Sequence, residues 1–473
     1  WGEWDTTPAI RAVLGRDEAS LRGQSALDLA IAAADRACME ALLAYVPKLR
    51  PRTAKSSESL GGSSEADEAS ISGWGSEFGE AFWESSQEQI NLLNAPNPLT
   101  GYTPLCAIAM APGNHAALWA KRLAQRSADV NAKGTGGGDT PLTAAVLRGE
   151  SALARMLLRL GGDVNSRAGD GRPILQVSVD RDDSSMIDLL MAAPDCNLDV
   201  TDLKGRTPLV AALRCRRVQR AAELALLLIK ARCSVDARDN NGAAPILHAA
   251  GVPSQELSSL LLERRADRDA VDPADGSHVL HLAVQAGNGP LLQALLDGGS
   301  SVHAPHPRDG RTVLHLAVGF RMTPLVRRLL ELGAEVDARS AVGDTAVRLA
   351  AQAGDVETAR LLCQAKADPN LANRSGCAAI HAAVSSGNVA LVQLLATYRA
   401  DPHLADARRW RPIHYGASVG SGGVVEWLLA KRADPDCRSF HGRTPRQLGR
   451  AGAARAVAPG GEAPTPRRAR PAA

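Results

Sequence analysis

The sequence is poor in aromatic residues and has no long apolar run. Phe, Trp and Tyr together make up 3% of the 473 residues, although 45% of the residues are apolar. A core of this composition has to be built from Ala, Leu and Val, and Ala and Leu are strong helix formers. No stretch reaches the roughly 18 consecutive apolar residues that a membrane span needs. We therefore expect closely packed helices and no membrane span.

The chain also lacks a strong net charge and paired cysteines. Its formal net charge of +3 gives no whole-chain indication of nucleic-acid or membrane binding. The eight cysteines lie far apart and form no Cys-x-x-Cys pair, which disfavours zinc sites and redox motifs. We expect an intracellular, reducing compartment. The cytoplasm and an organelle matrix or stroma, reached after removal of a transit peptide, both fit.

Signatures of catalysis are missing as well. There is no Gly-x-Ser-x-Gly elbow, no kinase signature and no His-Glu-x-x-His pair. The glycine-rich string 134–138 is not followed by the Gly-Lys-Ser/Thr of a phosphate-binding loop. We therefore expect no enzyme activity, no cofactor and no metal.

What the sequence does contain is a short phrase that recurs along the chain. The phrase is Thr140-Pro141-Leu142, and its variants follow one another at intervals of 32 to 37 residues. Such a constant interval over most of a chain is typical of repeat architectures. The first positions of the phrase are Thr103, Thr140, Arg172, Thr207, Ala244, His278, Thr312, Thr345, Ala378, Arg411 and Thr444.

Each repeat has the same predicted local structure. Thr caps the helix that follows, and Pro suits the first turn of that helix because no amide partner is needed there. An apolar first helix such as 314–318 is followed by a turn and by a second helix such as 358–362. Apolar residues recur three and four positions apart on the second helix and would face its neighbours. A turn containing Gly then leads into the next repeat.

These repeats resemble the ankyrin repeat, whose period is about 33 and whose signature is Thr-Pro-Leu-His-x-Ala. Val279–Ala283 and Val313–Ala317 carry the signature with Val in place of Pro, and Pro412–His414 carry it without the Thr. The resemblance covers residues 100–450, and residues 1–52 contain further ankyrin-like units. It implies an all-α ankyrin-repeat solenoid of stacked helix-turn-helix units with short finger turns. It also implies that the fingers and first helices bind proteins.

Histidines recur at the signature position of five repeats. The resemblance implies that they hydrogen-bond neighbouring turns rather than bind a metal. They are His248, His281, His315, His381 and His414.

The segment 53–99 interrupts the repeats and has an unusual composition. It holds eight carboxylates and one lysine, a net charge of 1 − 8 = −7, and it begins as a Ser/Gly-rich linker. Trp74, Phe78 and Phe82 are four residues apart and Trp83 adjoins them, which predicts a short helix with one aromatic face. We expect this helix to pack on a partner or back on the solenoid. The alternative is chance enrichment within a solvated loop.

The C-terminal end is basic. From Arg443 onward there are seven arginines against Glu462, and residues 451–473 form a Pro/Arg-rich tail. This tail is either solvated or laid on an acidic surface or RNA. Arginines and aromatic residues also cluster on the last fingers, where Asp406 has a structural turn position. An Arg-rich genome is the alternative explanation. The candidate partner-binding residues here are Arg374, Arg408, Arg409, Trp410, Arg438, Phe440 and Arg443.

These features predict a non-catalytic protein-interaction scaffold, a structural subunit of a larger multiprotein assembly. Two alternatives remain open at this point. One is a transient regulatory adaptor that binds a single client through its concave face. The other is an RNA-contacting subunit that uses the Arg-rich fingers and tail, and the salt dependence of binding would separate it from the others.

Overall fold

The computed structural model describes residues 93–97, 101–110, 116–135 and 138–449. The chain divides into two compact units, which we call the N-terminal unit (Trp1–Asn240) and the C-terminal unit (Asn241–Ala473). Several predicted features lie outside the described residues: the ankyrin-like units in 1–52, the tail 451–473, and most of the acidic segment with Trp74, Phe78, Phe82 and Trp83.

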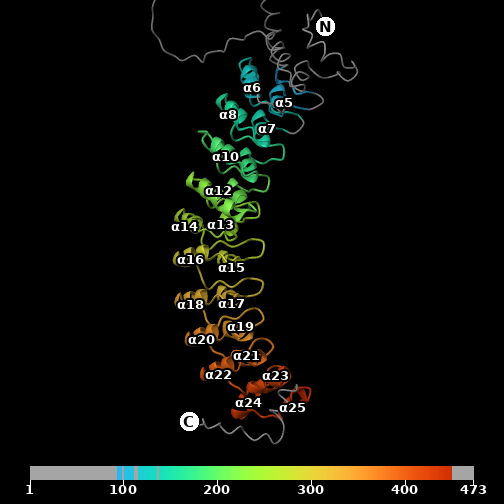
Figure 1. The fold of residues 1–473 in the computed structure, drawn as a ribbon, viewed down its shortest axis with the longest axis vertical. Coiled ribbons are helices and arrows are strands. Elements are labelled where there is room, and N and C mark those ends of the chain that lie inside the picture. The colour runs from blue at the N-terminus through green and yellow to red at the C-terminus, as the bar shows by residue number, and fades with distance from the viewer. Residues whose placement is uncertain (1–92, 98–100, 111–115, 136–137, 450–473) are drawn as a thin grey trace, which may run out of the picture. The chain divides into compact units, whose positions relative to one another are not determined.

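The described part of the N-terminal unit consists of four helix pairs (Figure 1). The helices are α5 (Pro104–Met110), α6 (Ala116–Ala124), α7 (Pro141–Arg148), α8 (Ser151–Arg159), α9 (Ile174–Asp180), α10 (Ser184–Met191), α11 (Pro208–Leu213) and α12 (Val218–Lys230).

The described part of the C-terminal unit consists of six further pairs and one additional first helix. The first helices are α13 (Pro245–Ala249), α15 (Val279–Gln285), α17 (Val313–Gly319), α19 (Ala346–Ala353), α21 (Ala379–Ser385), α23 (Pro412–Val419) and α25 (Pro445–Leu448). The second helices are α14 (Gln255–Glu263), α16 (Gly289–Asp297), α18 (Thr323–Glu331), α20 (Val356–Gln364), α22 (Val389–Thr397) and α24 (Gly422–Ala430).

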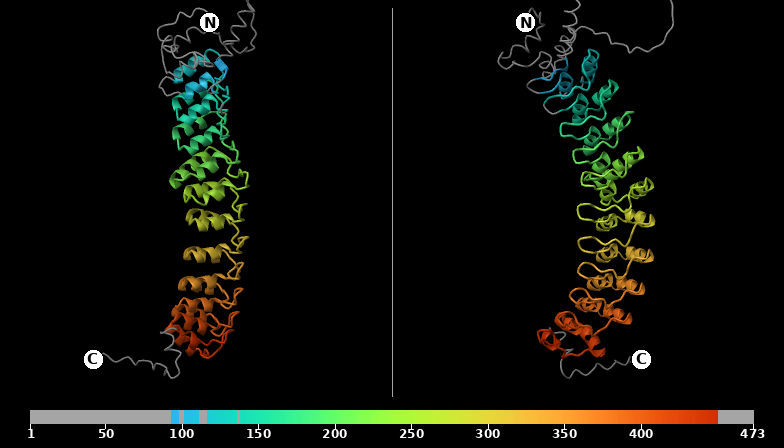
Figure 2. Two further views of the ribbon diagram at one scale, coloured as in Figure 1. Left: turned by 90° about the vertical axis from the view of Figure 1, so that its right-hand side faces the viewer. Right: turned by 180° about the vertical axis from the view of Figure 1, so that it is seen from behind.

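Within each unit the helix pairs are layered, and the finger loops project to one side of them (Figure 2). The described residues contain no β-strand, only isolated bridges between Arg167 and Pro173 and between Val271 and His278. The predicted all-α solenoid of paired helices with short finger turns is therefore confirmed.

The first helices begin as the sequence predicts. The Thr140 side chain accepts a hydrogen bond from the backbone N–H of Thr143 at 3.2 Å, and Pro141 occupies the first turn. Gly149 ends α7 in the left-handed conformation, with φ of 77°, where a residue without Cβ is favoured. The Thr-Pro phrase is thus a helix start and the following Gly a helix stop.

Two details of the predicted register are wrong. The residue that caps α9 is Pro173 rather than Arg172, because the Arg172 backbone N–H is bound to the Asp170 side chain at 3.0 Å, outside the helix. The spacings on either side of Pro173 become 33 and 34, more regular than expected. In α13, Ala244 is the cap, so the signature position falls on Leu247 and His248 stands one residue later.

The first helices make most of the contacts between repeats, and the second helices add to them. Most caps of the second helices are polar, as in α20, where the Asp355 side chain accepts the backbone N–H of Thr358 at 3.1 Å. Leu314 of α17 and Leu329 of α18 are 1% and 0% exposed, so both lie in the core of their repeat. The main helix contacts are made within a repeat or with the adjacent repeat, as in a solenoid.

The stretch 93–97 packs against the N-terminal unit. Leu93 is buried, and the Asn94 side chain accepts the backbone N–H of Asp129 at 2.7 Å. Asn131 accepts the backbone N–H of Asp163 in the same way one repeat later. Residues 93–97 therefore make the contacts of a repeat.

None of the helices in the described ranges is both long enough and apolar enough to cross a membrane.

Candidate functional site

The fingers are shaped by a polar side chain five residues before the cap of the first helix. In the finger before α23, Asp406 Oδ1 accepts the backbone N–H groups of Arg408 at 2.8 Å and Trp410 at 2.6 Å. Its Oδ2 accepts the Tyr415 hydroxyl at 2.7 Å. Asn373 holds its own finger by two equivalent backbone bonds. Asp406 therefore has the structural role that its turn position predicts.

Successive fingers of the C-terminal unit are joined near their tips by backbone hydrogen bonds. The bonds run from Arg374 N to Val342 O (3.0 Å), from Ala407 N to Ser375 O (3.1 Å) and from Phe440 N to Arg408 O (2.9 Å). Gly376, with φ of 75°, allows this close approach, because a Cβ there would lie 2.5 Å from Ala407 N. The tips 338–343, 371–376, 404–409 and 437–442 thus form a continuous surface, which we call the finger row.

The predicted arginines lie along or beside this finger row. Arg374, Arg408, Arg409, Arg438 and Arg443 are all exposed, and none forms an ion pair with another described residue. The four tips hold five arginines and one aspartate, a net charge of 5 − 1 = +4. That aspartate, Asp406, is only 7% exposed, so the accessible charge of the row is positive.

The two aromatic residues predicted on the last fingers have different surroundings. Phe440 is 69% exposed and is thus available to a partner. Trp410 is half-buried: its ring stacks on His414, with centroids 5.9 Å apart, and meets Tyr415 edge-on at 5.2 Å. Trp410 therefore packs against residues at the base of its own finger.

A hollow of about 470 Å³ lies where the first helices α19, α21 and α23 meet the base of a finger. The Tyr415 ring forms one wall and meets the His381 ring edge-on at 5.5 Å. Burial raises the pKa of the Tyr415 hydroxyl, so it stays protonated and donates to Asp406. The hollow is lined mainly by Arg348, Gln352, Cys377, His381, Ser385 and Tyr415.

Arg348 is the charged group of this hollow. It stands at the signature position of its repeat, where other repeats have His, and its side chain is 12% exposed. Its guanidinium pairs with Asp344 and contacts the Gln352 amide oxygen at 3.3 Å. Asp344 is held in turn by the Asn373 side chain at 2.9 Å. The Nε of Arg348 is buried and has no hydrogen-bond partner in the described structure.

Sequence reasoning missed Arg348 and Tyr415. The signal for Arg348 was present, because an arginine replaces His at the most regular polar position of the repeat. No comparable signal exists for the hollow itself, since its walls come from three repeats.

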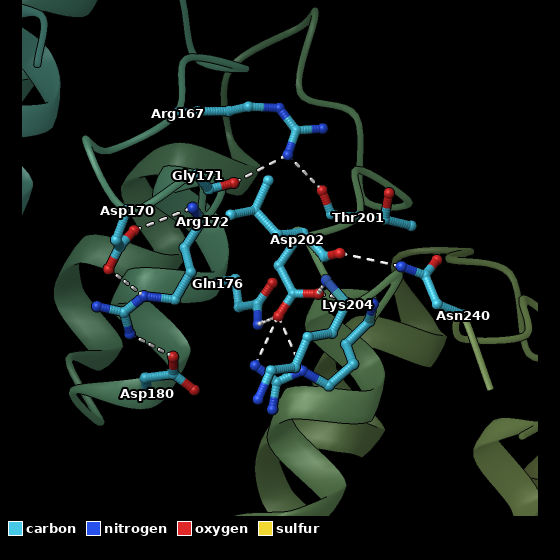
Figure 3. Close-up of polar contacts among 12 residues, drawn as sticks. Arg167, Asp170, Gly171, Arg172, Gln176, Asp180, Thr201, Asp202, Lys204 and Asn240 are labelled. Atoms are coloured by element: carbon cyan, nitrogen blue, oxygen red, sulfur yellow. Dashed lines mark hydrogen bonds and ion pairs between the residues drawn. The ribbon is translucent and has the colours of Figure 1, made fainter. Parts of the chain in front are cut away.

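A related polar cluster organises a finger of the N-terminal unit (Figure 3). Asp202 is buried and receives hydrogen bonds from the Gln176 side chain at 3.1 Å, the Arg206 side chain at 2.8 Å and the Lys204 amide at 2.9 Å. Burial alone would raise the pKa of Asp202, but these bonds outweigh it and hold that pKa below its usual range. Asp202 is therefore ionised and fixes the finger through its partners.

The neighbouring finger in Figure 3 is braced by two arginines. Arg172 bridges Asp170 and Asp180, with both N···O distances at 2.7 Å. Arg167 donates to the carbonyl oxygens of Gly171 and Thr201, which lie on successive fingers. These guanidinium groups are hydrogen-bonded within the repeats, unlike those of the finger row.

Three of the signature histidines make the predicted contacts with neighbouring turns. His315 Nδ1 accepts the Thr312 backbone N–H at 3.1 Å, and its Nε2 lies 2.9 Å from the Asp344 carbonyl oxygen. His281 and His381 contact the carbonyl oxygens of later fingers in the same way, at 3.1 and 3.0 Å. Burial lowers the pKa of each of these three rings, so they are neutral at pH 7.

Across the ranges that the structure describes, no group of three or more His, Cys, Asp or Glu side chains is arranged to hold a metal ion.

Comparisons with known proteins match this geometry. A model of three ankyrin repeats matches residues 280–373 and 347–439, and a single ankyrin repeat matches 137–168. Rabankyrin-5 from Mus musculus is 31% identical over 169 residues, and rabankyrin-5 from Homo sapiens 30%; the match covers 35% of this chain and 14% of each relative. Neurogenic locus notch homolog protein 2 from Homo sapiens is 30% identical over 150 residues, 32% of this chain and 6% of that protein.

The chain thus spans a small part of the length of these relatives. The matched residues coincide with the helix pairs and fingers described above, and they fall in both units. The array is built of ankyrin repeats, and the chain is a member of the ankyrin-repeat proteins.

Proposed function

We propose that this protein binds a protein partner through the finger row and the adjoining first helices of its C-terminal unit. Ankyrin repeats are a protein-interaction architecture, and the family and the relatives found are generally non-catalytic. The finer proposal is that the chain is a fixed scaffold subunit of a larger assembly.

The finger row carries this proposal. Its arginines are exposed and unpaired within the described structure, and Phe440 exposes a large apolar ring beside them. Arg and aromatic side chains dominate the binding energy of protein interfaces. The backbone bonds between fingers hold these groups in place before a partner arrives, which lowers the entropy cost of association.

The proposal is tested by reversing three charges of the row. In the full chain, Arg408→Glu, Arg409→Glu and Arg438→Glu together should strongly reduce the amount of each partner that co-purifies, because an attractive surface becomes repulsive. The measurement is quantitative mass spectrometry of material recovered with the tagged protein from its native cells.

A matched control has the same change of charge elsewhere. Arg327→Glu, Arg360→Glu and Arg399→Glu alter exposed positions outside the finger tips, on α18, α20 and the turn after α22. Partners should be retained by this variant. If the two triple variants lose the same partners to the same degree, or neither loses any, the finger row is not the binding surface.

The stoichiometry and lifetime of the complex separate a scaffold from a transient adaptor. A fixed subunit should co-elute with its partners at constant ratio after dilution and long washing, whereas an adaptor should dissociate. The RNA-contacting alternative predicts instead that nuclease treatment releases the bound material and that affinity falls steeply with salt.

We also propose an intracellular, reducing compartment for this protein. The seven cysteines in the described ranges are free thiols, and burial raises the pKa of Cys363 to about 11, which keeps that thiol unreactive. Non-reducing electrophoresis of freshly lysed cells, with free thiols blocked at lysis, tests this proposal. A disulfide-linked form under those conditions would contradict it.

A further inference from the structure

We infer that the partner segment is acidic, an inference that rests on the proposed function of the finger row. One carboxylate of an extended segment enters the hollow beside Arg348, and further acidic residues of the same segment lie over Arg374 and Arg408 on the following fingers.

The buried guanidinium of Arg348 is the first observation. Its Nε has no acceptor although its surroundings exclude solvent, and an unpaired buried donor is costly. Asp344 and the Gln352 oxygen engage its Nη2 only. The side chain is therefore fixed in position, and its Nη1, which makes no hydrogen bond within the described structure and is not among its buried unpartnered atoms, is the donor left for an oxygen of a ligand in the hollow.

The other polar groups of the hollow do not supply that acceptor. Ser385 and Ser386 donate their hydroxyls to backbone carbonyl oxygens of α21, at 2.8 Å each. The Tyr415 hydroxyl donates to Asp406. The oxygen of the Gln352 amide already accepts from Arg348, which leaves its N–H groups as further donors. An acidic side chain would thus meet donors from two residues.

The distribution of charge favours a carboxylate over a neutral carbonyl. Asp344 pairs with Arg348 and Asp406 lies within the finger row, and both are buried and already hydrogen-bonded. The arginines Arg374, Arg408 and Arg409 have no such partner and are exposed. The accessible charge of the four tips is therefore positive, which attracts an acidic segment and repels a basic one.

The spacing of these cations favours a polypeptide over a small molecule. Arg348, Arg374 and Arg408 belong to three successive repeats, so a single small carboxylate cannot contact all three. A hollow of about 470 Å³ accepts one or two side chains of a longer chain. Single-stranded RNA is disfavoured because its successive bases stack on several aromatic side chains, whereas the finger row exposes Phe440 and Trp410 is already engaged by His414 and Tyr415.

The test is a selection of random dodecapeptides displayed on phage against the full chain. Peptides enriched by the wild-type protein should be rich in Asp and Glu. Synthetic versions of the best binders are then measured by fluorescence anisotropy at low and high salt, together with copies in which each Glu or Asp is replaced by Gln or Asn. The amide copies should bind about tenfold more weakly or worse.

Arg348→His is the informative variant, because His occupies this position in other repeats and the repeat tolerates it. It should fold normally, as checked by circular dichroism, and weaken the selected acidic peptides by about tenfold. Arg360→Gln, on the second helix α20, is the control and should not change their affinity. Arg374→Gln with Arg408→Gln should weaken the peptides and flatten the salt dependence of binding.

Enrichment of neutral or basic peptides would overturn the inference, as would acidic peptides that bind Arg348→His unchanged. Binding of an oligouridylate in place of any acidic peptide would also overturn it. The proposed function fails separately, through co-purification that survives the triple charge reversal. If that reversal released a partner whose bound segment is neutral, the proposed function would stand. Only the acidic character of the partner segment would then be refuted.

Discussion

In the C-terminal unit, three signature histidines reach from a first helix to the carbonyl of a later finger, whereas the N-terminal unit has no described histidine at this position. Its four residues there are Cys106, Thr143, Gln176 and Val210. Cys106 still makes the same contact, since its Sγ lies 3.4 Å from the carbonyl oxygen of Asp139, just before the next cap. Gln176 reaches the next finger through the Asp202 carboxylate instead.

The comparison shows that a polar link between helix and finger does not depend on histidine, since Cys106 and Gln176 also make one, and that a repeat can lack it, since Val210 is apolar. Buried backbone carbonyls have to be paired, and several side chains can do so. The side chain at this position also determines other properties of the repeat. Histidine makes its stability depend on pH, and Arg348 places a positive charge beside a hollow. The predictions below test whether the two units are equivalent in packing and different in chemistry.

The largest effect is expected from the core, where the units should behave alike. Leu157 in α8 and Leu329 in α18 are both fully buried and are both the seventh residue of a second helix. Leu157→Ala and Leu329→Ala should each reduce the free energy of unfolding of their own repeat by about 2–5 kcal/mol. Hydrogen–deuterium exchange followed by mass spectrometry measures this locally. Loss of protection spread evenly through both units by either change would contradict a solenoid of nearest-neighbour contacts.

Close approach of adjacent fingers should also be common to both units. Gly205 and Gly376 have φ of 73° and 75°, and a Cβ would lie 2.6 Å from Asn240 N and 2.5 Å from Ala407 N, respectively. Gly442 has φ of 74° but nothing within 4 Å, so it is the matched control for strain alone. Gly442→Ala should cost about 1–3 kcal/mol, and Gly205→Ala and Gly376→Ala more. Equal melting temperatures for the three variants would show that the finger backbones do not touch.

The histidine link should distinguish the units. His315→Leu leaves the Asp344 carbonyl and the Thr312 amide without their side-chain partner, and it should cost about 1–3 kcal/mol. His303 is exposed, so His303→Leu should change stability little. Urea denaturation followed by circular dichroism measures both. Indistinguishable midpoints would mean that the histidine contributes no more than a surface residue.

Acidification should loosen the C-terminal unit first. Burial lowers the pKa of His281, His315 and His381, whereas in the unfolded chain histidine titrates at about 6.5. Stability from these groups is therefore complete above about pH 6.5 and falls as the pH drops below it, because the unfolded state takes up protons that the folded state resists. The lowered pKa of Asp202 in the N-terminal unit acts only below about pH 4.

Exchange protection corrected for intrinsic rates should thus decrease between pH 7 and pH 5 in the repeats of α15–α22 and stay constant in those of α7–α12. His315→Leu should flatten the response of its own repeat. Equal losses in both units over this range would remove histidine as the cause.

The architecture was predictable because it repeats. A single Thr-Pro phrase is weak, but eleven occurrences at a nearly constant interval fix where helices begin, and the apolar spacing fixes which face is buried. The two register errors arose where the phrase was degenerate. Before Pro173 there is no Thr to mark the cap, and the Arg172 backbone N–H is bound to the Asp170 side chain. In the repeat capped by Ala244, the histidine stands one residue after the signature position.

The candidate site was only partly predictable. Exposure of Arg374, Arg408 and Phe440 follows from their place at finger tips, which the repeat alignment supplies. The burial of Trp410 against His414 and the pairing of Arg348 with Asp344 depend on side-chain directions and on neighbouring repeats. A one-dimensional pattern does not contain that information. The aromatic segment with Trp74, Phe78, Phe82 and Trp83 stays a prediction.

The smallest effect on stability is expected at the tips of the fingers, and it sharpens the contrast between finger base and finger tip. Base residues such as Asp202 and Asp406 hold several donors each, so Asp406→Ala should destabilise its repeat by about 1–3 kcal/mol. At the tips, Arg408→Glu with Arg409→Glu removes no contact that a described side chain makes, and the free energy of unfolding should change by no more than about 0.5 kcal/mol. Thermal melts of the two variants beside the wild type measure both effects. A tip variant that melted as early as the base variant would mean that the arginines support the fold, and their exposure would then no longer argue for a partner.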